Sequence, residues 1–454
     1  MINIARIRFI VKTVSKRDTI MEFILTDEPL QCLKDLVAIQ KDGEAAVQDY
    51  IKNSLENHGC TMRYFDYLPS NVPVKGEFSS DNINVERPRR ALVAEAKGDP
   101  NLPSLLIFAH PDSELVREIE QWRSDPFVPA EIEGRLFGWG VADDLAGCAC
   151  AIAAIKTVLH KNKTHLGSII FASTPSKNFA RGVSALLHAG LTADASLYLH
   201  PAESGRGLSE IKAIASGQLE FIITIHGKPP DTTEPGHTAF SHLAENPIEK
   251  AFLVANALAK LNEVRNQKIM HKAIHCEVGR STNLHISRIV SNEENRLSRI
   301  NKTCTLGGAI SFPPKETLEE TKNEIEQAIE KMAQNDPWLR VNPPELKWLS
   351  GVTGGEVDMS SPFYKIVSSS VKEVTSQEPF VNPMHTSSDI KNPIVEADIP
   401  CLGLGCLGGN LSQNNQTDEW VDISDFNRMV DVTAKVIERW CGNEQNKRPN
   451  GHSH

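Results

Sequence analysis

Short, continuously apolar runs alternate with longer amphipathic stretches through the first 215 residues of the chain. Apolar runs of this kind are typical of strands buried on both faces. They span residues 91–96, 104–109, 167–174 and 195–200. The stretches between them predict helices over residues 144–162 and 180–190. This alternation predicts an α/β fold with a mostly parallel sheet covered by helices on both faces.

The middle of the chain has a different pattern, with longer strands and long polar-faced helices. Strands are predicted over residues 217–227, 284–290 and 302–312, and helices over 246–264 and 315–334. Beyond residue 353 the first pattern returns, with a strand at 399–405 and a last helix. The predicted organisation is therefore one α/β domain interrupted by an inserted α+β layer. Its segments are an N-terminal extension 1–21, a first part 22–215, the insertion 216–352, a second part 353–442 and a polar tail 443–454.

Composition limits the kinds of partner and the cellular compartment that we expect for this protein. The formal net charge is −10, which argues against nucleic acid or an anionic membrane surface as a partner. Apolar runs stay shorter than the roughly 18 residues that a membrane helix needs. The nine cysteines are odd in number and form no C-x-x-C pair, so we expect free thiols and a cytoplasmic protein.

Candidate chemistry lies where predicted strands end. His110 and Asp112 directly follow the strand at 104–109, and His200 ends the strand at 195–200. Asp143 stands in a glycine-rich turn directly before a predicted helix. Ligands of open α/β sheets bind beyond the carboxyl ends of the strands. Imidazole and carboxylate are common metal ligands, so the residues indicate a metal site. Asp143, and likewise the adjacent Asp144, is also suited to capping the helix that follows.

The order of several short motifs resembles one known family. The motifs are HPDSE (110–114), SDPF (124–127), EGRLFGWG (133–140), VADDLAG (141–147), GHTAFSHLAENPI (236–248), HTSSDIK (385–391) and DEWVDISDF (418–426). They resemble the co-catalytic zinc peptidases and deacylases, which include acetylornithine deacetylase, succinyl-diaminopimelate desuccinylase, aminoacylase and glutamate carboxypeptidase. The resemblance implies a mostly parallel-sheet catalytic domain with an inserted α+β lid and dimerisation domain, and a homodimer formed through that lid.

The resemblance also implies residue roles. His110 resembles a ligand of the first metal, and Asp112 the carboxylate that orients its imidazole. Asp143 resembles the carboxylate that bridges two metals. His237 resembles the lid histidine that reaches the partner's active site and stabilises the oxyanion. His200 stands where the family has an acidic ligand, and as a histidine it remains a competent ligand or, alternatively, a buried polar residue.

Two departures from the family fall on the second metal site. Ser176, Lys177 and Asn178 occupy the region of a Glu-Glu pair that supplies the general base and a ligand. Asn415 stands where the family has its last histidine ligand. We therefore expect one Zn²⁺ ion rather than two, with other divalent ions possible and none if the site is degenerate. Lys177 is either a solvated loop residue or an ammonium placed where the second cation was.

The sequence does not identify the general base. Glu203, His385 and Asp389 are candidates for that role or for contact with the substrate. Asp389 is also suited to fixing its own loop by side-chain hydrogen bonds. The expected function is a metal-dependent amide hydrolase, of deacylase or dipeptidase type, acting on an N-acyl amino acid or small peptide. The alternative is a pseudoenzyme that binds a small ligand or a partner without hydrolysis.

Overall fold

The structure is a computed structural model. It describes residues 16–79, 86–116, 118–161, 165–177, 179–202, 204–234, 237–291, 297–383, 388–408, 416–443 and 445, without the side chains of 16–27. Four of the residues singled out above lie outside this part of the chain: Asn178, Glu203, His385 and Asn415.

The main domain is built on a six-stranded sheet with the order β1-β3-β7-β4-β8-β17. The strands are β1 Thr61–Tyr67, β3 Arg89–Ala96, β7 Ile169–Ser173, β4 Leu105–Ala109, β8 Ala195–Leu199 and β17 Cys401–Leu404. The pairs β7–β4, β4–β8 and β8–β17 are parallel, while β1 and β3 add an antiparallel edge. The expected α/β fold with a mostly parallel sheet is confirmed.

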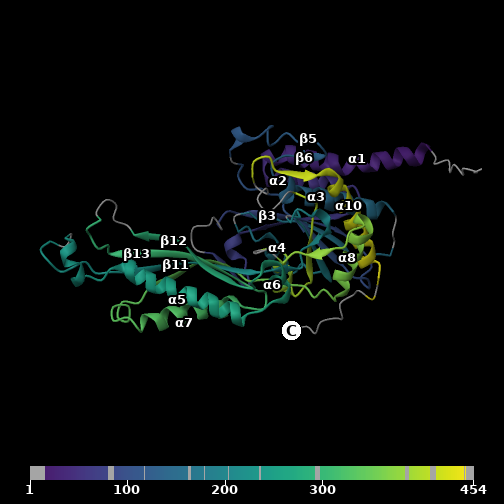
Figure 1. Ribbon diagram of the computed structural model, residues 1–454. Coiled ribbons are helices and arrows are strands. Elements are labelled where there is room, and N and C mark those ends of the chain that lie inside the picture. Colours follow the sequence, from purple (N-terminus) through teal and green to yellow (C-terminus); the bar gives the residue numbers. More distant parts are fainter. Residues whose placement is uncertain are drawn as a thin grey trace, which may run out of the picture.

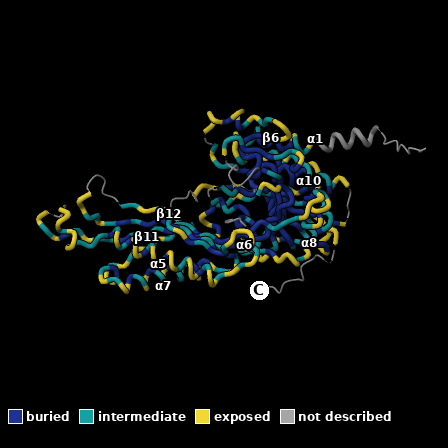
Figure 2. The backbone as a smooth tube through the Cα atoms, viewed as in Figure 1, coloured by how far each residue is buried: buried dark blue, intermediate teal, exposed yellow. Residues whose placement is uncertain are grey.

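Helices cover both faces of this sheet, as the apolar strands require (Figure 1). They are α1 Lys16–Ile39, α2 Glu44–Glu56, α3 Ala146–His160, α4 Gly182–His188, α8 Pro362–Thr375, α9 Lys391–Ala397 and α10 Ile423–Cys441. Alternate residues of β4 enter opposite cores: Leu105 and Ile107 pack with α1, α3 and α10, whereas Leu106 and Phe108 pack with α4. The main domain therefore holds most of the buried chain (Figure 2).

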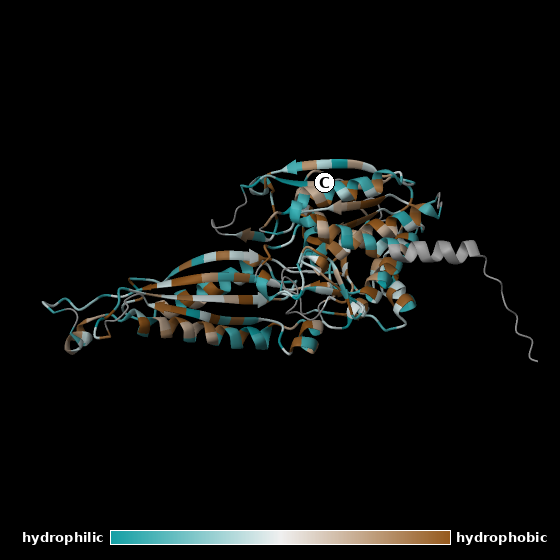
Figure 3. Ribbon diagram, turned by 90° about the horizontal axis from the view of Figure 1, so that it is seen from above, coloured by the Kyte–Doolittle hydropathy of each residue, from teal (hydrophilic) through white to brown (hydrophobic). Residues whose placement is uncertain are grey.

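The lid is a five-stranded antiparallel sheet with helices on one face, and it extends away from the main domain (Figure 1). Its strands are β12 Asn283–Ser291, β13 Thr303–Phe312, β11 Gly217–His226, β14 Glu345–Val352 and β2 Glu77–Ser79, and its helices are α5 Pro247–Lys268, α6 Lys272–Val278 and α7 Leu318–Ala333. Apolar and polar positions alternate along its strands (Figure 3). In β11, Leu219, Phe221 and Ile223 are buried in the core beneath α5 and α7.

One strand of the lid sheet comes from outside the expected insertion. β2 precedes the main-domain strand β3 in the chain, yet Phe78 pairs with Gly351 of β14. The lid is therefore attached to the main domain through residues 77–79 as well as through the two ends of the insertion.

Smaller elements complete the fold. β18 Trp420–Asp422, β6 Arg135–Phe137 and β5 Ala130–Ile132 form a three-stranded sheet, and two short pairs join β9 Glu210–Ile211 with β16 Phe380–Val381 and β10 Ile214–Ala215 with β15 Gly355–Glu356. Within the described part of the chain, each helix is too short or too polar to cross a bilayer.

Candidate active site

The site lies at the carboxyl ends of two neighbouring parallel strands. His110 follows β4 and His200 follows β8. Asp143 and Asp144 stand in the turn Val141–Leu145 that leads into α3. The start of α3 lies directly against the end of β8, because a Cβ atom on Gly147 would lie 2.3 Å from the carbonyl oxygen of Leu199. This close approach brings the two aspartates next to the strand ends.

Asp143, Asp144 and His200 form the one group of potential metal ligands found among the described residues. One ligand atom from each lies within 4.8 Å of the others. Nδ1 of His200 is 2.6 Å from Asp144 Oδ1 and 3.7 Å from Asp143 Oδ1. Both aspartates are buried. Sequence reasoning treated Asp144 only as a helix cap; the signal that could have found it is the adjacent pair of aspartates before a helix that starts at a strand end.

His110 belongs to a neighbouring pair rather than to this group. Its Nδ1 lies 2.6 Å from the carbonyl oxygen of Thr174, and its Nε2 lies 2.9 Å from Asp389 Oδ2 and 3.6 Å from Asp144 Oδ2. Burial disfavours protonation, but the negative charges of Asp144 and Asp389 prevail and raise the pKa of His110 to about 9. The expected convergence of His110, Asp143 and His200 is thus replaced by Asp143, Asp144 and His200.

Asp112 does not orient His110 as expected. Its carboxylate accepts from Arg89 Nη2 at 2.6 Å and from the backbone N–H groups of Ser176 and Lys177, both at 2.9 Å. The physical reason is twofold: Thr174 already holds the inner nitrogen of His110, and the buried guanidinium of Arg89 needs a carboxylate partner. Asp112 therefore fixes the loop that carries Lys177.

Lys177 places an ammonium on the expected bridging carboxylate. Its Nζ lies 2.7 Å from Asp143 Oδ2, and the two side chains are only 13% and 7% exposed. Burial would raise the pKa of Asp143, but Lys177 and His200 outweigh it and hold that pKa well below its usual range. The neighbouring Ser176 donates its hydroxyl to Asp389 Oδ2 at 3.1 Å.

Glu419 is a site residue to which sequence reasoning gave no role. Its fully buried carboxylate accepts from the backbone N–H groups of Gly140, Ala142 and Asp143. Burial, with the charge of Asp143, raises the pKa of Glu419 to about 8. β18, which begins at the next residue, pairs with β6 just before the turn. Glu419 thus holds the backbone that presents Asp143; its position in the DEW motif was the available signal.

His237 lies in the lid, in the segment after β11. It is exposed, and its ring accepts from the backbone N–H of Ala239 at 3.0 Å. β11 starts beside the main domain and runs away from it for ten residues before this segment. Within one chain, the structure therefore does not bring His237 to the aspartates.

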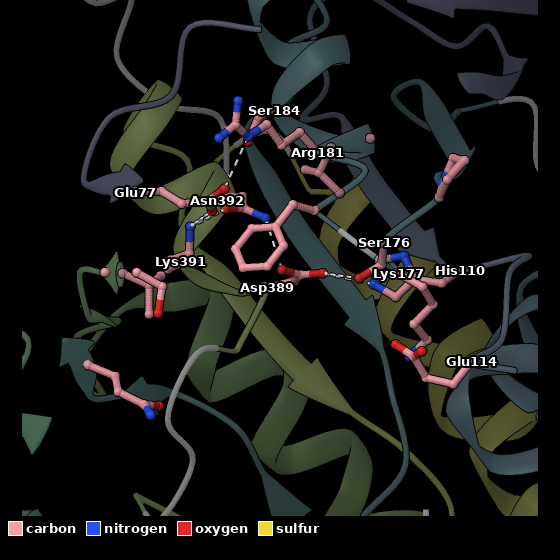
Figure 4. A pocket seen from close by; sticks show the side chains of 18 of the residues that line it. Glu77, His110, Glu114, Ser176, Lys177, Arg181, Ser184, Asp389, Lys391 and Asn392 are labelled. Carbon is pink, nitrogen blue, oxygen red and sulfur yellow. Dashed lines mark hydrogen bonds and ion pairs between the residues drawn. The ribbon is translucent and has the colours of Figure 1, made fainter. Parts of the chain in front are cut away.

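A cavity of about 430 Å³ lies between the main domain and the base of the lid (Figure 4). Asp143, Asp144 and His200 are not among its lining residues, but Lys177, which lines it, contacts Asp143. Its main-domain end holds His110, Lys177 and Asp389. Its lid wall comes from β11 and β14. Volumes of this size are typical of small-molecule sites.

Comparison with known proteins decides the family. Residues 106–439 match the family model described as "Peptidase family M20/M25/M40". The chain belongs to this family. The resemblance stated from its motifs is confirmed, and so is the α/β fold that the family implies.

Curated members cover nearly the whole chain. It is 24% identical over 449 residues to the N-formyl-4-amino-5-aminomethyl-2-methylpyrimidine deformylase of Bacillus subtilis, covering 92% of this chain and 96% of the relative. It is 25% identical over 432 residues to the succinyl-diaminopimelate desuccinylase of Rhodospirillum centenum, covering 92% and 98%. Both relatives are named for removing an acyl group, a formyl group in the first and a succinyl group in the second.

Solved structures agree on the fold. A tripeptidase from Staphylococcus aureus is 15% identical with a TM-score of 0.68, covering 92% of this chain and 99% of that one. Human carnosine dipeptidase 1 is 14% identical with a TM-score of 0.61, covering 95% and 100%. A Bacillus subtilis member, 15% identical with a TM-score of 0.56 and covering 92% and 99%, is described as a dinuclear metal-binding peptidase.

The donor set of this chain fits one metal ion. Two carboxylates and an imidazole suit Zn²⁺. Oδ2 of Asp144 is buried and has no hydrogen-bond partner among the described residues, so it is available to a cation. A dinuclear arrangement fits poorly, because the ammonium of Lys177 is paired with the carboxylate that a second ion would share.

Proposed function

We infer that the chain hydrolyses the amide bond of a small N-acylated compound or peptide, with one divalent ion held by Asp143, Asp144 and His200. The observation that carries this proposal is the donor group of Asp143, Asp144 and His200, in which the buried Oδ2 of Asp144 has no hydrogen-bond partner among the described residues. The cavity next to it has the volume of a small-molecule site.

The bound ion and two residues that line the cavity have separate proposed roles in hydrolysis. A divalent ion, when bound, lowers the pKa of a coordinated water molecule and polarises the amide carbonyl. Protonated His110 lines the cavity, and its Nε2, next to Asp389, is suited to passing a proton to the leaving nitrogen. Glu114 also lines the cavity near His110 and Lys177 (Figure 4), and we assign it the role of general base.

A second candidate is ligand binding without hydrolysis. Each expected ligand already has a side-chain partner within hydrogen-bond distance: Lys177 for Asp143, Asp144 for His200, and Asp389 for His110. The described part of the former Glu-Glu region supplies Ser176 and Lys177, neither of which is a carboxylate. These pairs would keep the fold intact without any metal.

One experiment separates the two candidates. The purified chain is analysed for bound metal and assayed on N-formyl, N-acetyl and N-succinyl amino compounds and dipeptides, with Zn²⁺, Co²⁺ or Mn²⁺ added. The hydrolase proposal expects turnover that disappears in Asp143→Asn and falls ~10²–10⁴-fold in Glu114→Gln, because a positioned base contributes that much. Absence of turnover with every metal, in a correctly folded protein, would leave the binding role.

The oligomeric proposal is a cytoplasmic homodimer formed through the lid. Large apolar side chains are exposed on one lid helix and on the edge strand: Phe252 and Leu253 on α5, and Ile289 on β12. In such a dimer the exposed His237 would be available to the partner's cavity. Light scattering of the purified chain and of a Phe252→Glu variant tests it, with the monomer expected for the variant.

A further inference from the structure

A stacked aromatic pair lies next to the two histidines of the site. Phe108 on β4 and Tyr198 on β8 are partners across neighbouring parallel strands, with ring centroids 4.7 Å apart and ring planes 5° apart. His110 and His200 each come two residues later in the chain. Since side chains alternate along an extended chain, each histidine shares a face with the aromatic residue that precedes it. The repeated pattern, F-x-H at 108–110 and Y-x-H at 198–200, therefore gathers these rings at the strand ends.

Tyr198 contacts both histidines, and its hydroxyl group reaches the metal-ligand group. The centroid of its ring lies 4.9 Å from that of His200, with the planes 21° apart, and 5.2 Å from that of His110. Tyr198 is only 3% exposed, and a buried phenol needs a hydrogen-bond partner. Its oxygen lies 2.9 Å from Nδ1 of His200, and its O–H also bonds to the carboxylate of Asp144. Tyr198 is thus a buried polar residue in contact with two of the three potential ligands.

The phenol oxygen limits how the imidazole of His200 can turn. Oδ1 of Asp144 lies 2.6 Å from the same Nδ1, so imidazole, carboxylate and phenol meet at one point. If the ring of His200 turned by half a rotation, it would present a carbon atom to both oxygens and lose both contacts. The other strand end is arranged differently, because Phe108 has no hydroxyl group and Nδ1 of His110 is held by the carbonyl oxygen of Thr174.

We propose that Tyr198 is a positioning residue, which holds the imidazole of His200 so that Nδ1 faces Asp143 and Asp144 and is available to a divalent ion. Stacking fixes the plane of the imidazole, and the hydroxyl group fixes which edge of the ring faces the aspartates. Groups that orient a metal ligand typically change metal affinity ~10–100-fold when they are replaced. This inference rests on the metal site of the proposed hydrolase, yet its tests measure metal binding and the spectrum of the metal-free protein rather than turnover.

Tyr198→Phe removes the hydroxyl group and keeps the stacked ring. We expect the affinity of the whole chain for Zn²⁺, measured by calorimetry against a competing chelator, to fall about tenfold. The matched control is Tyr50→Phe, which removes a phenol that donates to Asp35 at 2.9 Å between α2 and α1. This control should keep the wild-type affinity. Melting temperatures in chelator show how far each variant is destabilised, so that a loss of affinity is compared at similar stability.

Nuclear magnetic resonance of the metal-free protein tests the contact without any ion. The histidines are labelled with nitrogen-15, and His200 is assigned by the signals that disappear in His200→Gln. Tyr198→Phe should move the Nδ1 signal of His200, since this nitrogen loses an oxygen 2.9 Å away, whereas Tyr50→Phe should leave it in place. Tyr198→Leu also removes the stacked ring, so the His200 signals should broaden or split as the imidazole takes up more than one orientation.

The outcomes separate the role of Tyr198 from the reaction. Unchanged Zn²⁺ affinity in Tyr198→Phe, an equal loss in Tyr50→Phe, or an unmoved Nδ1 signal of His200 each overturns the positioning role. A loss of affinity confined to Tyr198→Phe, without turnover under any metal, supports the positioning role while the hydrolase proposal fails. Turnover with unchanged affinity in Tyr198→Phe does the reverse, and a wild-type protein that binds no Zn²⁺ overturns both.

Discussion

The ammonium of Lys177 lies 2.7 Å from the carboxylate of Asp143, inside the strand-end site of a chain that belongs to the M20 peptidases. The pair is held from both sides. Asp112 accepts from the backbone N–H of Lys177, and Glu419 accepts from the backbone N–H of Asp143. The ammonium of Lys177 neutralises the buried carboxylate of Asp143 as a metal cation would. The chain therefore balances this negative charge with its own side chain.

Replacing Lys177 by Glu is expected to let the site bind a second divalent ion. The substitution removes the positive charge on Asp143 and adds a carboxylate to the same loop, and carboxylates are competent ligands for such ions. Mass-spectrometric metal analysis after dialysis against Zn²⁺ gives the stoichiometry. Lys161→Glu, an exposed lysine paired with Glu438, is the charge control. Equal metal content in the wild-type protein and Lys177→Glu would contradict the prediction.

Replacing Lys177 by Met tests the pair without adding a ligand. Asp143 would then be a largely buried carboxylate without its closest cation, and breaking a buried pair in this way costs about 3–5 kcal/mol. We expect a lower melting temperature in the presence of chelator and a partial recovery when Zn²⁺ is added, since a cation again faces Asp143. If Zn²⁺ does not restore the melting temperature, the lost stability comes from the loop that carries Lys177 and not from the unpaired charge of Asp143.

Replacing Glu419 by Gln tests how the turn of Asp143 is held. One carboxylate oxygen of Glu419 accepts from Ala142 and Asp143, and the other accepts from Gly140. A glutamine keeps one acceptor but turns an NH₂ group toward a backbone N–H, so one buried donor loses its partner. The expected loss is about 1–3 kcal/mol of folding stability, measured by urea unfolding.

A metal titration on the same variant separates positioning from general destabilisation. Metal affinity is expected to fall in Glu419→Gln, because the turn presents Asp143 and Asp144. Glu373→Gln, a surface glutamate on α8 paired with Lys435, provides the control. Unchanged metal affinity in a destabilised Glu419→Gln protein would reduce Glu419 to a purely structural role.

The fold was largely predictable because it depends on patterns that persist over many residues. The strand predicted over 104–109 is apolar at every position after Ser104, and β4, Leu105–Ala109, is buried at every position between helices on both faces. The helix at 315–334 was predicted from its apolar stripe and is found as α7. The strand Glu77–Ser79 escaped prediction, because three residues carry too little pattern to show that they join a sheet formed by residues far along the chain.

The site was predictable only in part, because its contacts connect segments distant in sequence. The sequence located His110, Asp143 and His200 at strand and helix ends, where the structure has them. It could not tell that Thr174 takes the inner nitrogen of His110, or that Asp389 takes the outer one. Spacing within a motif also made Asp112 look like a partner of His110, whereas Arg89 on β3 is its closest cation.

The lid contains an aspartate, Asp336, whose ionisation is expected to make the stability of the fold depend on pH independently of the candidate active site. Asp336 accepts from the backbone N–H groups of Trp338 and Leu339 and from Lys250 Nζ at 2.8 Å. Burial would raise its pKa, but the hydrogen bond from Lys250 and those from the backbone outweigh it and lower the pKa. A carboxyl whose folded pKa lies below its unfolded value stabilises the fold above the unfolded pKa, about 4 for aspartate, and loses that contribution as the pH falls through the folded pKa.

Asp336→Asn removes this titration while keeping the size of the side chain. At neutral pH we expect the variant to melt below the wild-type protein, since Lys250 loses its closest carboxylate and keeps only the more exposed Glu245 at 3.1 Å. The difference should shrink as the pH falls below about 4, where the wild-type carboxyl also becomes neutral. Asp66→Asn, an exposed aspartate paired with Arg90 on the main domain, is the control. A difference in melting temperature that stays constant or widens with acid would show that Asp336 acts through the shape of its turn and not through its charge.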